Sequence, residues 1–270
     1  MTLRDAHRFK LSIYVLSIGI LANALFSLLD LRLISDLLLV TSFLASLFLS
    51  VTSIWKSAFI LPLVGSLVGF TSEFIGLKYG FPFGHYSYEG FGARIAGVPI
   101  PIVIAWGIYL YVCYLSAAPF FKGMERIIIT ALLMVLLDLA IDPVMVELGV
   151  WRWEEAGEWF GIPSSNFLGW FITSIVALLL YKMLARRHDL GENTMKLASI
   201  PYILSFLPIL SISGASSRVP SLISLIMALV LFSILVLVKV DQKRPSYTLR
   251  SGQGHVQASY QLLRIINGHV

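Results

Sequence analysis

The chain has 270 residues, of which 57% are hydrophobic and 13% charged, and its mean hydropathy is +0.84. A soluble domain of this length needs no such apolar excess for its core, so the composition predicts an integral membrane protein of the all-α class. The formal net charge of +5 would suit an acidic partner. The basic residues are instead sorted by membrane topology, and nothing supports binding to nucleic acid.

Eight apolar runs of about 20 residues are expected to cross the ~30 Å hydrocarbon core as helices. The seventh run is the weakest, because Pro201 and Pro208 interrupt it and serines dilute its end. The first run has the length of a spanning helix and no small-residue cleavage site follows it, so we expect a retained helix, not a signal peptide. The runs cover residues 10–29, 35–55, 58–78, 98–121, 125–148, 166–185, 197–214 and 220–240.

The runs and the polar end of the chain define the expected domains. Residues 1–244 are predicted to form a transmembrane domain, and 245–270 a polar cytoplasmic tail of disordered composition, too short to bury a core. With the N-terminus inside, fifteen of the 20 lysines and arginines are cytoplasmic. This bias predicts a multi-pass cell-membrane protein with both termini in the cytoplasm. The five basic residues on the other side are Arg32, Lys78, Arg94, Arg152 and Arg218.

Two stretches of the chain resemble each other at an offset of 65 residues. Glu73, Gly84, Tyr86, Tyr88, Glu89 and Gly92 correspond to Asp138, Gly149, Trp151, Trp153, Glu154 and Gly157. After a one-residue slip, residues 97–99 and Trp106 correspond to 161–163 and Trp170. The correspondence predicts a central parallel repeat of two-helix units, approximately 58–121 and 125–185, about a pseudo-two-fold axis along the membrane normal. The alternative is coincidence, since aromatic residues gather at membrane interfaces and Gly and Pro at helix ends in any membrane protein.

The two copied connections, 79–97 and 149–165, are longer than the others and lie on the non-cytoplasmic side in this topology. Each ends in Gly-x-Pro, at Pro99 and Pro163. Proline fixes φ and tolerates the missing N–H in a first helical turn, so the next helix is expected to begin there. Candidate cap side chains for the second of these helices are Ser164, Ser165 and Asn166.

Acidic residues inside apolar runs are the strongest functional signal. Glu73 lies late in the third run, and Asp138 and Asp142 lie on one face of the fifth. A carboxylate at the bilayer centre costs about 2.5 to 3.5 kcal/mol on insertion scales, so such residues usually face a cavity or a partner. We predict Glu73 and Asp138 as acid and base, with Asp142 assisting. The alternative is a buried pair that fixes helix register, or a salt bridge to Arg94 or Arg152.

Aromatic rings in the two loops suit the same chemistry, because their π-faces stabilise a cation by ~0.5 to 2 kcal/mol. The alternative for each ring is anchoring at the membrane interface. The candidate substrate-binding residues are His85, Tyr86, Tyr88, Trp106, Trp151, Trp153, Asn166 and Trp170.

No metal or cofactor is expected. His85 has no histidine partner at helical spacing, whereas membrane hydroxylases need several histidines to hold iron. Cys113 is the only cysteine, which excludes an internal disulfide and favours a packing role. Nucleotide-binding glycine motifs and a nucleophile elbow are missing from the sequence. Four loop acids could bind a cation, but such residues are more often solvated: Glu89, Glu154, Glu155 and Glu158.

The loops also resemble the membrane hydratases of carotenoid biosynthesis, which include bisanhydrobacterioruberin hydratase and γ-carotene 1′-hydratase. The resemblance spans about 65–175. Its first part is EFIG at 73–76, YGFPFGHYSY at 79–88 and GVP at 97–99. Its second part is DP at 142–143, GVWRW at 149–153, GIP at 161–163 and NFLGW at 166–170.

The resemblance implies hydration of the terminal double bond of an acyclic carotenoid, giving a tertiary alcohol. The substrate would enter sideways from membrane lipid, and other carotenoid-pathway membrane enzymes are the implied neighbours. Protonation of the alkene needs a neutral carboxylic acid, aromatic walls and a base that orients water, which the copied units could provide. Two alternatives stay open. A cyclase or isomerase would give an isomeric product, and a proton-coupled lipid carrier would leave its cargo unchanged.

Overall fold

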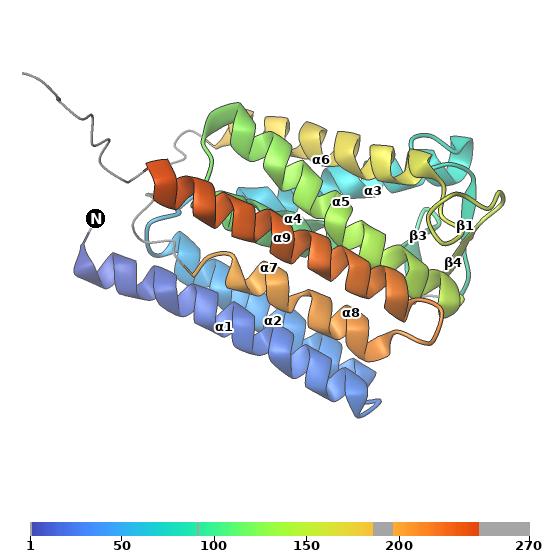
Figure 1. The fold of residues 1–270 in the computed structure, drawn as a ribbon, viewed down its shortest axis with the longest axis horizontal. Coiled ribbons are helices and arrows are strands. Elements are labelled where there is room, and N and C mark those ends of the chain that lie inside the picture. The colour runs from blue at the N-terminus through green and yellow to red at the C-terminus, as the bar shows by residue number, and fades with distance from the viewer. Residues whose placement is uncertain (1, 91, 186–196, 243–270) are drawn as a thin grey trace, which may run out of the picture. The chain divides into compact units, whose positions relative to one another are not determined.

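The structure is a computed structural model that describes residues 2–90, 92–185 and 197–242. The predicted tail at 245–270 therefore lies outside the described residues. Contacts divide the chain into Met1–Phe232 and Ser233–Val270, and the strands, the cavity and all helices except the end of α9 lie in the first of these units. Its helices run side by side (Figure 1). The helices are α1 (Leu3–Leu28), α2 (Arg32–Val51), α3 (Ile60–Tyr79), α4 (Ile100–Ala117), α5 (Gly123–Glu147), α6 (Ser164–Leu184), α7 (Ile200–Leu204), α8 (Phe206–Ile212) and α9 (Arg218–Gln242).

The all-α membrane class is confirmed. Within the described residues, seven helices are long and apolar enough to cross a membrane. The expected seventh span differs from the prediction: it is a shorter apolar segment, broken at Ser205 into α7 and α8. The physical reason is Pro208, which has no N–H to donate to the carbonyl of Leu204 and whose ring crowds that carbonyl.

Both proline starts predicted from the sequence are confirmed. Pro99 and Pro163 are extended N-cap residues, and α4 and α6 begin immediately after them. None of the three predicted caps closes the start of α6. Glu158 does so, because its carboxylate accepts hydrogen bonds from Ser164 N at 3.3 Å and Oγ at 2.7 Å. These bonds, led by the hydroxyl, lower the pKa of Glu158.

Helices α3 to α6 pack together, with α3 against α4 and α6, and α5 against α4 and α6. The α1–α2 hairpin joins them through α7 and α8. Close approach of α3 and α4 depends on small residues. A Cβ built on Gly69 would lie 2.3 Å from Trp106 Cγ, and one on Gly107 would lie 2.6 Å from the carbonyl oxygen of Pro62. These glycines bring the Trp106 indole over α3.

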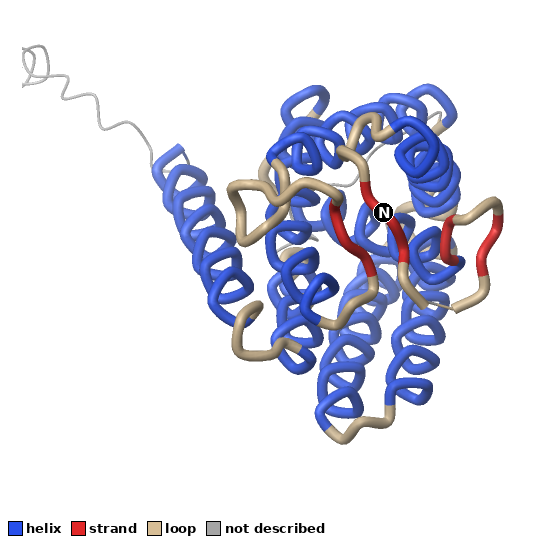
Figure 2. The backbone as a smooth tube through the Cα atoms, turned by 90° about the vertical axis from the view of Figure 1, so that its right-hand side faces the viewer, coloured by secondary structure: helices blue, strands red, loops and turns tan. Residues whose placement is uncertain are grey.

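Four short strands lie in the two long loops, at one end of the helices (Figure 2). Strand β2 (Arg94–Ile95) pairs with β3 (Val98–Pro99) inside the first loop. Strand β1 (Tyr86–Tyr88) of the first loop pairs antiparallel with β4 (Trp151–Trp153) of the second. The two loops therefore form one structure, although they are far apart in the sequence.

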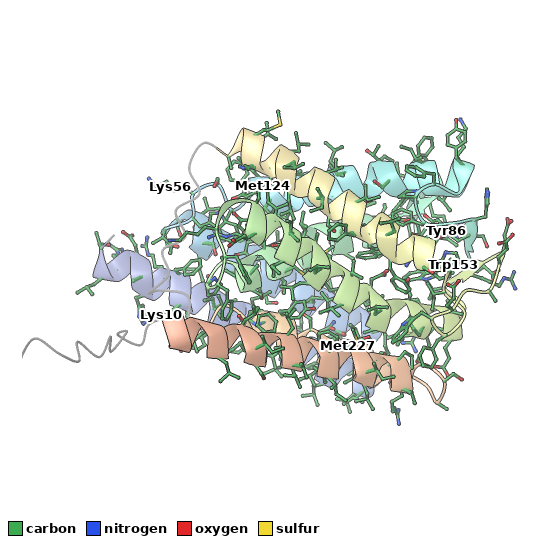
Figure 3. The ribbon with its side chains drawn as sticks, turned by 45° about the horizontal axis from the view of Figure 1, so that its top comes forward. Lys10, Lys56, Tyr86, Met124, Trp153 and Met227 are labelled. Atoms are coloured by element: carbon green, nitrogen blue, oxygen red, sulfur yellow. The ribbon has the colours of Figure 1, made fainter. Side chains whose placement is uncertain are left out.

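Lys10 and Lys56 lie at the end of the helices opposite to Tyr86 and Trp153 (Figure 3). We predict that the lysine end is cytoplasmic and the loop end is not, in keeping with the positive-inside bias. Reporter domains fused after Arg187 and after Ile95 should report opposite sides of the membrane. The same side for both fusions would contradict the predicted topology.

Candidate active site

Glu73 on α3 is buried, at 4% exposure, beneath the first loop. Its Oε1 accepts a hydrogen bond from Trp106 Nε1 at 3.0 Å. Its Oε2 accepts one from the Tyr88 hydroxyl at 2.8 Å and another from the Tyr86 hydroxyl. Three donors from two different elements converge on this carboxylate, a pattern that stabilises its charged form.

The two tyrosines are neutral donors at any physiological pH. Burial raises the pKa of the Tyr86 phenol, and the neighbouring Glu73 carboxylate raises it further. The pKa of Tyr88 is raised by the same two causes in the same order. Both hydroxyls therefore keep the proton that they donate to Glu73.

Asp138 and Asp142 form a second acidic group, on α5. They are 0% and 2% exposed, and the side chain of Asn166 on α6 is buried beside them at 2%. The Nδ2 of Asn166 donates to Asp138 Oδ2 at 2.7 Å and to Asp142 Oδ2 at 2.5 Å. Asp138 Oδ1 is buried without a hydrogen-bond partner. One amide group thus serves two carboxyls one helical turn apart, and such a pair holds a proton between its members.

A proline fixes the backbone at this pair. Pro143 lies inside α5, directly after Asp142, and it cannot donate to the carbonyl of Leu139. Trp159 of the second loop replaces the missing donor, since its Nε1 lies 3.0 Å from that carbonyl oxygen. The second loop is therefore tied to α5 between the two aspartates.

The β1–β4 ladder places the aromatic rings over the acids. Its register pairs Tyr86 with Trp153 and Tyr88 with Trp151, while Ser87 and Arg152 face outward and are exposed. Exposed Arg152 Nη2 lies 2.7 Å from Glu89 Oε1, which adds an ion pair between the loops. Below the ladder, Trp106 and Trp170 stack with ring centroids 4.1 Å apart.

These groups surround a cavity of about 50 Å³. One water needs roughly 10 to 15 Å³ by this measure, so there is room for water and a small branched group. The predicted site residues on its wall are Glu73, Tyr86, Tyr88, Trp106, Asp142, Trp151, Trp153, Asn166 and Trp170. The lining residues that the sequence did not single out are Phe83, Ile102, Ala105, Tyr109 and Ile141.

Two predicted site residues are not among those lining the cavity. Asp138 lies behind Asp142 and Asn166, bonded to the Asn166 amide. His85 is exposed, and its imidazole packs against Gly80, where a Cβ would lie 2.7 Å from the ring. Within the described ranges, no three His, Cys, Asp or Glu side chains are grouped so that they could share a metal ion. Cys113 is buried in α4.

The fold and the cavity define a class: a multi-pass helical membrane protein with an acidic, aromatic-walled cavity beneath its loops. Residues 33–235 match the carotenoid biosynthesis protein family, and the chain belongs to that family. The chain is also similar to bisanhydrobacterioruberin hydratase of Haloarcula japonica, with 29% identity over 125 residues. That match covers 43% of this chain and 42% of the relative. No solved structure matches the chain.

Proposed function

We propose that this protein hydrates the terminal C=C bond of an acyclic carotenoid to a tertiary alcohol. The observation that carries the proposal is the pair of acidic groups facing one aromatic cavity, Glu73 with three donors and Asp142 with a carboxyl neighbour. Acid–base chemistry needs one carboxyl that holds a proton and one that is ionised, and these two environments favour those two states. The family and the name of the similar hydratase support the choice of substrate and reaction.

The proton comes from the Asp138–Asp142 pair in this mechanism. Asp142 faces the cavity and shares the proton of the pair, so it is the group that can protonate the alkene. Addition of the proton to the CH carbon of an isopropylidene end leaves a tertiary cation. Asp138 acts behind Asp142, where it holds the shared proton and the Asn166 amide.

The cation forms between aromatic rings and the Glu73 carboxylate. Trp106, Trp153 and Trp170 line the cavity, and an indole π-system stabilises a nearby cation by ~0.5 to 2 kcal/mol. Water then forms the new C–O bond and gives up a proton to Glu73. Return of that proton to the aspartate pair through water closes the cycle, so that the alkene gains one water in total.

The direct test is product mass. Membranes containing the chain are incubated with bisanhydrobacterioruberin or with lycopene, and the pigments are separated and weighed by mass spectrometry. Hydration adds one or two waters. An isomeric product would identify a cyclase or isomerase, and unchanged pigment would overturn the proposal for these end groups.

We predict that the hydroxyl oxygen comes from solvent and that turnover needs neither oxygen nor an added metal. An anaerobic reaction with a chelator in heavy-oxygen water should proceed at the parental rate and give fully labelled alcohol. Label arriving from molecular oxygen in the converse experiment would identify an oxygenase.

A further inference from the structure

Trp151 lines the cavity with a buried donor that makes no hydrogen bond within the protein. Its side chain is 7% exposed and borders the cavity, yet its indole N–H has no hydrogen-bond partner. Burying a polar group without a partner is unfavourable, so an unpaired donor on a cavity wall points to a ligand.

The position of the indole places that donor between the two acidic groups. The ring packs edge-on against Tyr88, a donor to Glu73, with centroids 5.8 Å apart and planes at 87°. The N–H also lies close enough to the Asp142 carboxyl to interact with it, but not at hydrogen-bonding geometry. A small molecule bound to the Trp151 N–H would therefore lie in the cavity between Glu73 and Asp142.

Two other indole N–H groups on the cavity wall are already used. Trp106 donates to Glu73, and Trp153 donates to the carbonyl of Phe83 at 3.0 Å. Tyr86 has the corresponding place in the first loop, and its hydroxyl is bound to Glu73. Trp151 thus differs from Trp106 and Trp153 in having a buried donor left for a molecule in the cavity.

We propose that the Trp151 indole N–H positions the water that attacks the carbocation. The inference rests on the proposed hydration. The water accepts the N–H bond with one lone pair, donates an O–H to Glu73 and directs its second lone pair at the cationic carbon. Trp151 is then a positioning residue that decides the fate of the cation. Without this water, the cation returns a proton from an adjacent carbon to the acid and becomes an alkene again.

Trp151→Phe keeps an aromatic ring and removes the N–H, so it separates water capture from protonation. The reaction is run with lycopene in deuterated water, and two products are measured: the tertiary alcohol and recovered alkene carrying deuterium at the vinylic position. We expect the ratio of alcohol to deuterated alkene to fall by about tenfold, which corresponds to the loss of one hydrogen bond. Trp55→Phe is the matched control, because it removes a buried indole bond to Tyr181 at the opposite end of the helices. The ratio should not change in this control.

Each outcome decides the question. A parental ratio in Trp151→Phe would overturn the water-positioning role. If Trp151→Phe gives neither product, Trp151→Tyr is measured, which restores a donor: recovered hydration supports the role, whereas exchange alone or no reaction overturns it. Failure of hydration itself is recognised separately, since the parental chain would then give neither alcohol nor deuterated alkene.

Discussion

Glu73→Gln and Asp138→Asn should each lower the hydration rate by at least ~100-fold, within the usual range for general acid–base groups. The amide in place of Glu73 cannot take the proton from water. The amide in place of Asp138 removes the partner with which Asp142 shares its proton. We expect a similar loss for Asp142→Asn, because Asp142 faces the cavity. Rates are measured with lycopene in reconstituted vesicles.

The three variants should still insert and fold, since a neutral amide is cheaper to bury than an unpaired charge. Glu125→Gln is the control, because Glu125 is an exposed acid in the first turn of α5, the helix that carries both aspartates. It should keep the parental rate. Near-parental hydration by Glu73→Gln or Asp138→Asn would refute the paired-carboxyl mechanism, and the loop acids Glu89 and Glu154 would become the next candidates.

Gly69→Ala is expected to displace Trp106, a residue of the cavity wall, and so to lower the rate. The added methyl would lie 2.3 Å from Cγ and 2.7 Å from Cβ of Trp106, so the indole must move. The move would break the bond to Glu73 and the stack on Trp170. We expect the rate to fall at least ~10-fold, as for loss of a hydrogen bond to a charged group. Overpacking should also lower the free energy of unfolding by about 1 to 3 kcal/mol.

Gly19→Ala is the control that separates the effect of Gly69→Ala on the rate from its effect on stability. Its methyl would meet the side chain of Ser42 in α2, away from the cavity. Both variants are compared by thermal unfolding and by initial rate. Gly19→Ala should lower only stability, and a parental rate in Gly69→Ala would show that the position of Trp106 does not matter for turnover.

Much of the fold could be predicted because each long helix coincides with a long apolar run and both long loops end in Gly-x-Pro. The family resemblance is confirmed by the match to the carotenoid biosynthesis protein family and by the similarity to a bisanhydrobacterioruberin hydratase. The break between α7 and α8 was harder, since a proline pair kinks some spanning helices and shortens others. Pro208 removes a backbone hydrogen bond in either case, and packing against α1, α4 and α5 then favours one outcome.

The composition of the site was predictable, but not which side chains reach the cavity. Asp138 and Asp142 share a face of α5 and differ by one turn, so the sequence alone does not say which of them lies in front. Strand alternation could have separated His85 from Tyr86 and Tyr88, because adjacent residues of a strand point to opposite faces. Ile102, Ala105 and Tyr109 follow helical spacing on α4, yet a helix that is apolar all round gives no periodic signal.

The duplication remains a prediction. It is supported by the register of the ladder, in which Ser87 faces Arg152, the residue at the same place in the other copy. The stacked Trp106 and Trp170 are corresponding residues as well. A two-fold axis through these two contacts would produce both pairings.

The β1–β4 ladder also bears on how the protein is made. During synthesis, Tyr86–Tyr88 leaves the ribosome long before Trp151–Trp153, its pairing partner. Strand β1 of the first loop therefore stays unpaired and hydrated at the membrane surface until α4 and α5 have entered the bilayer and β4 has been made. Completion of the pocket is thus a late event of biogenesis, and a nascent chain released before residue 151 would have the three donors to Glu73 but lack β4, the second strand of the ladder.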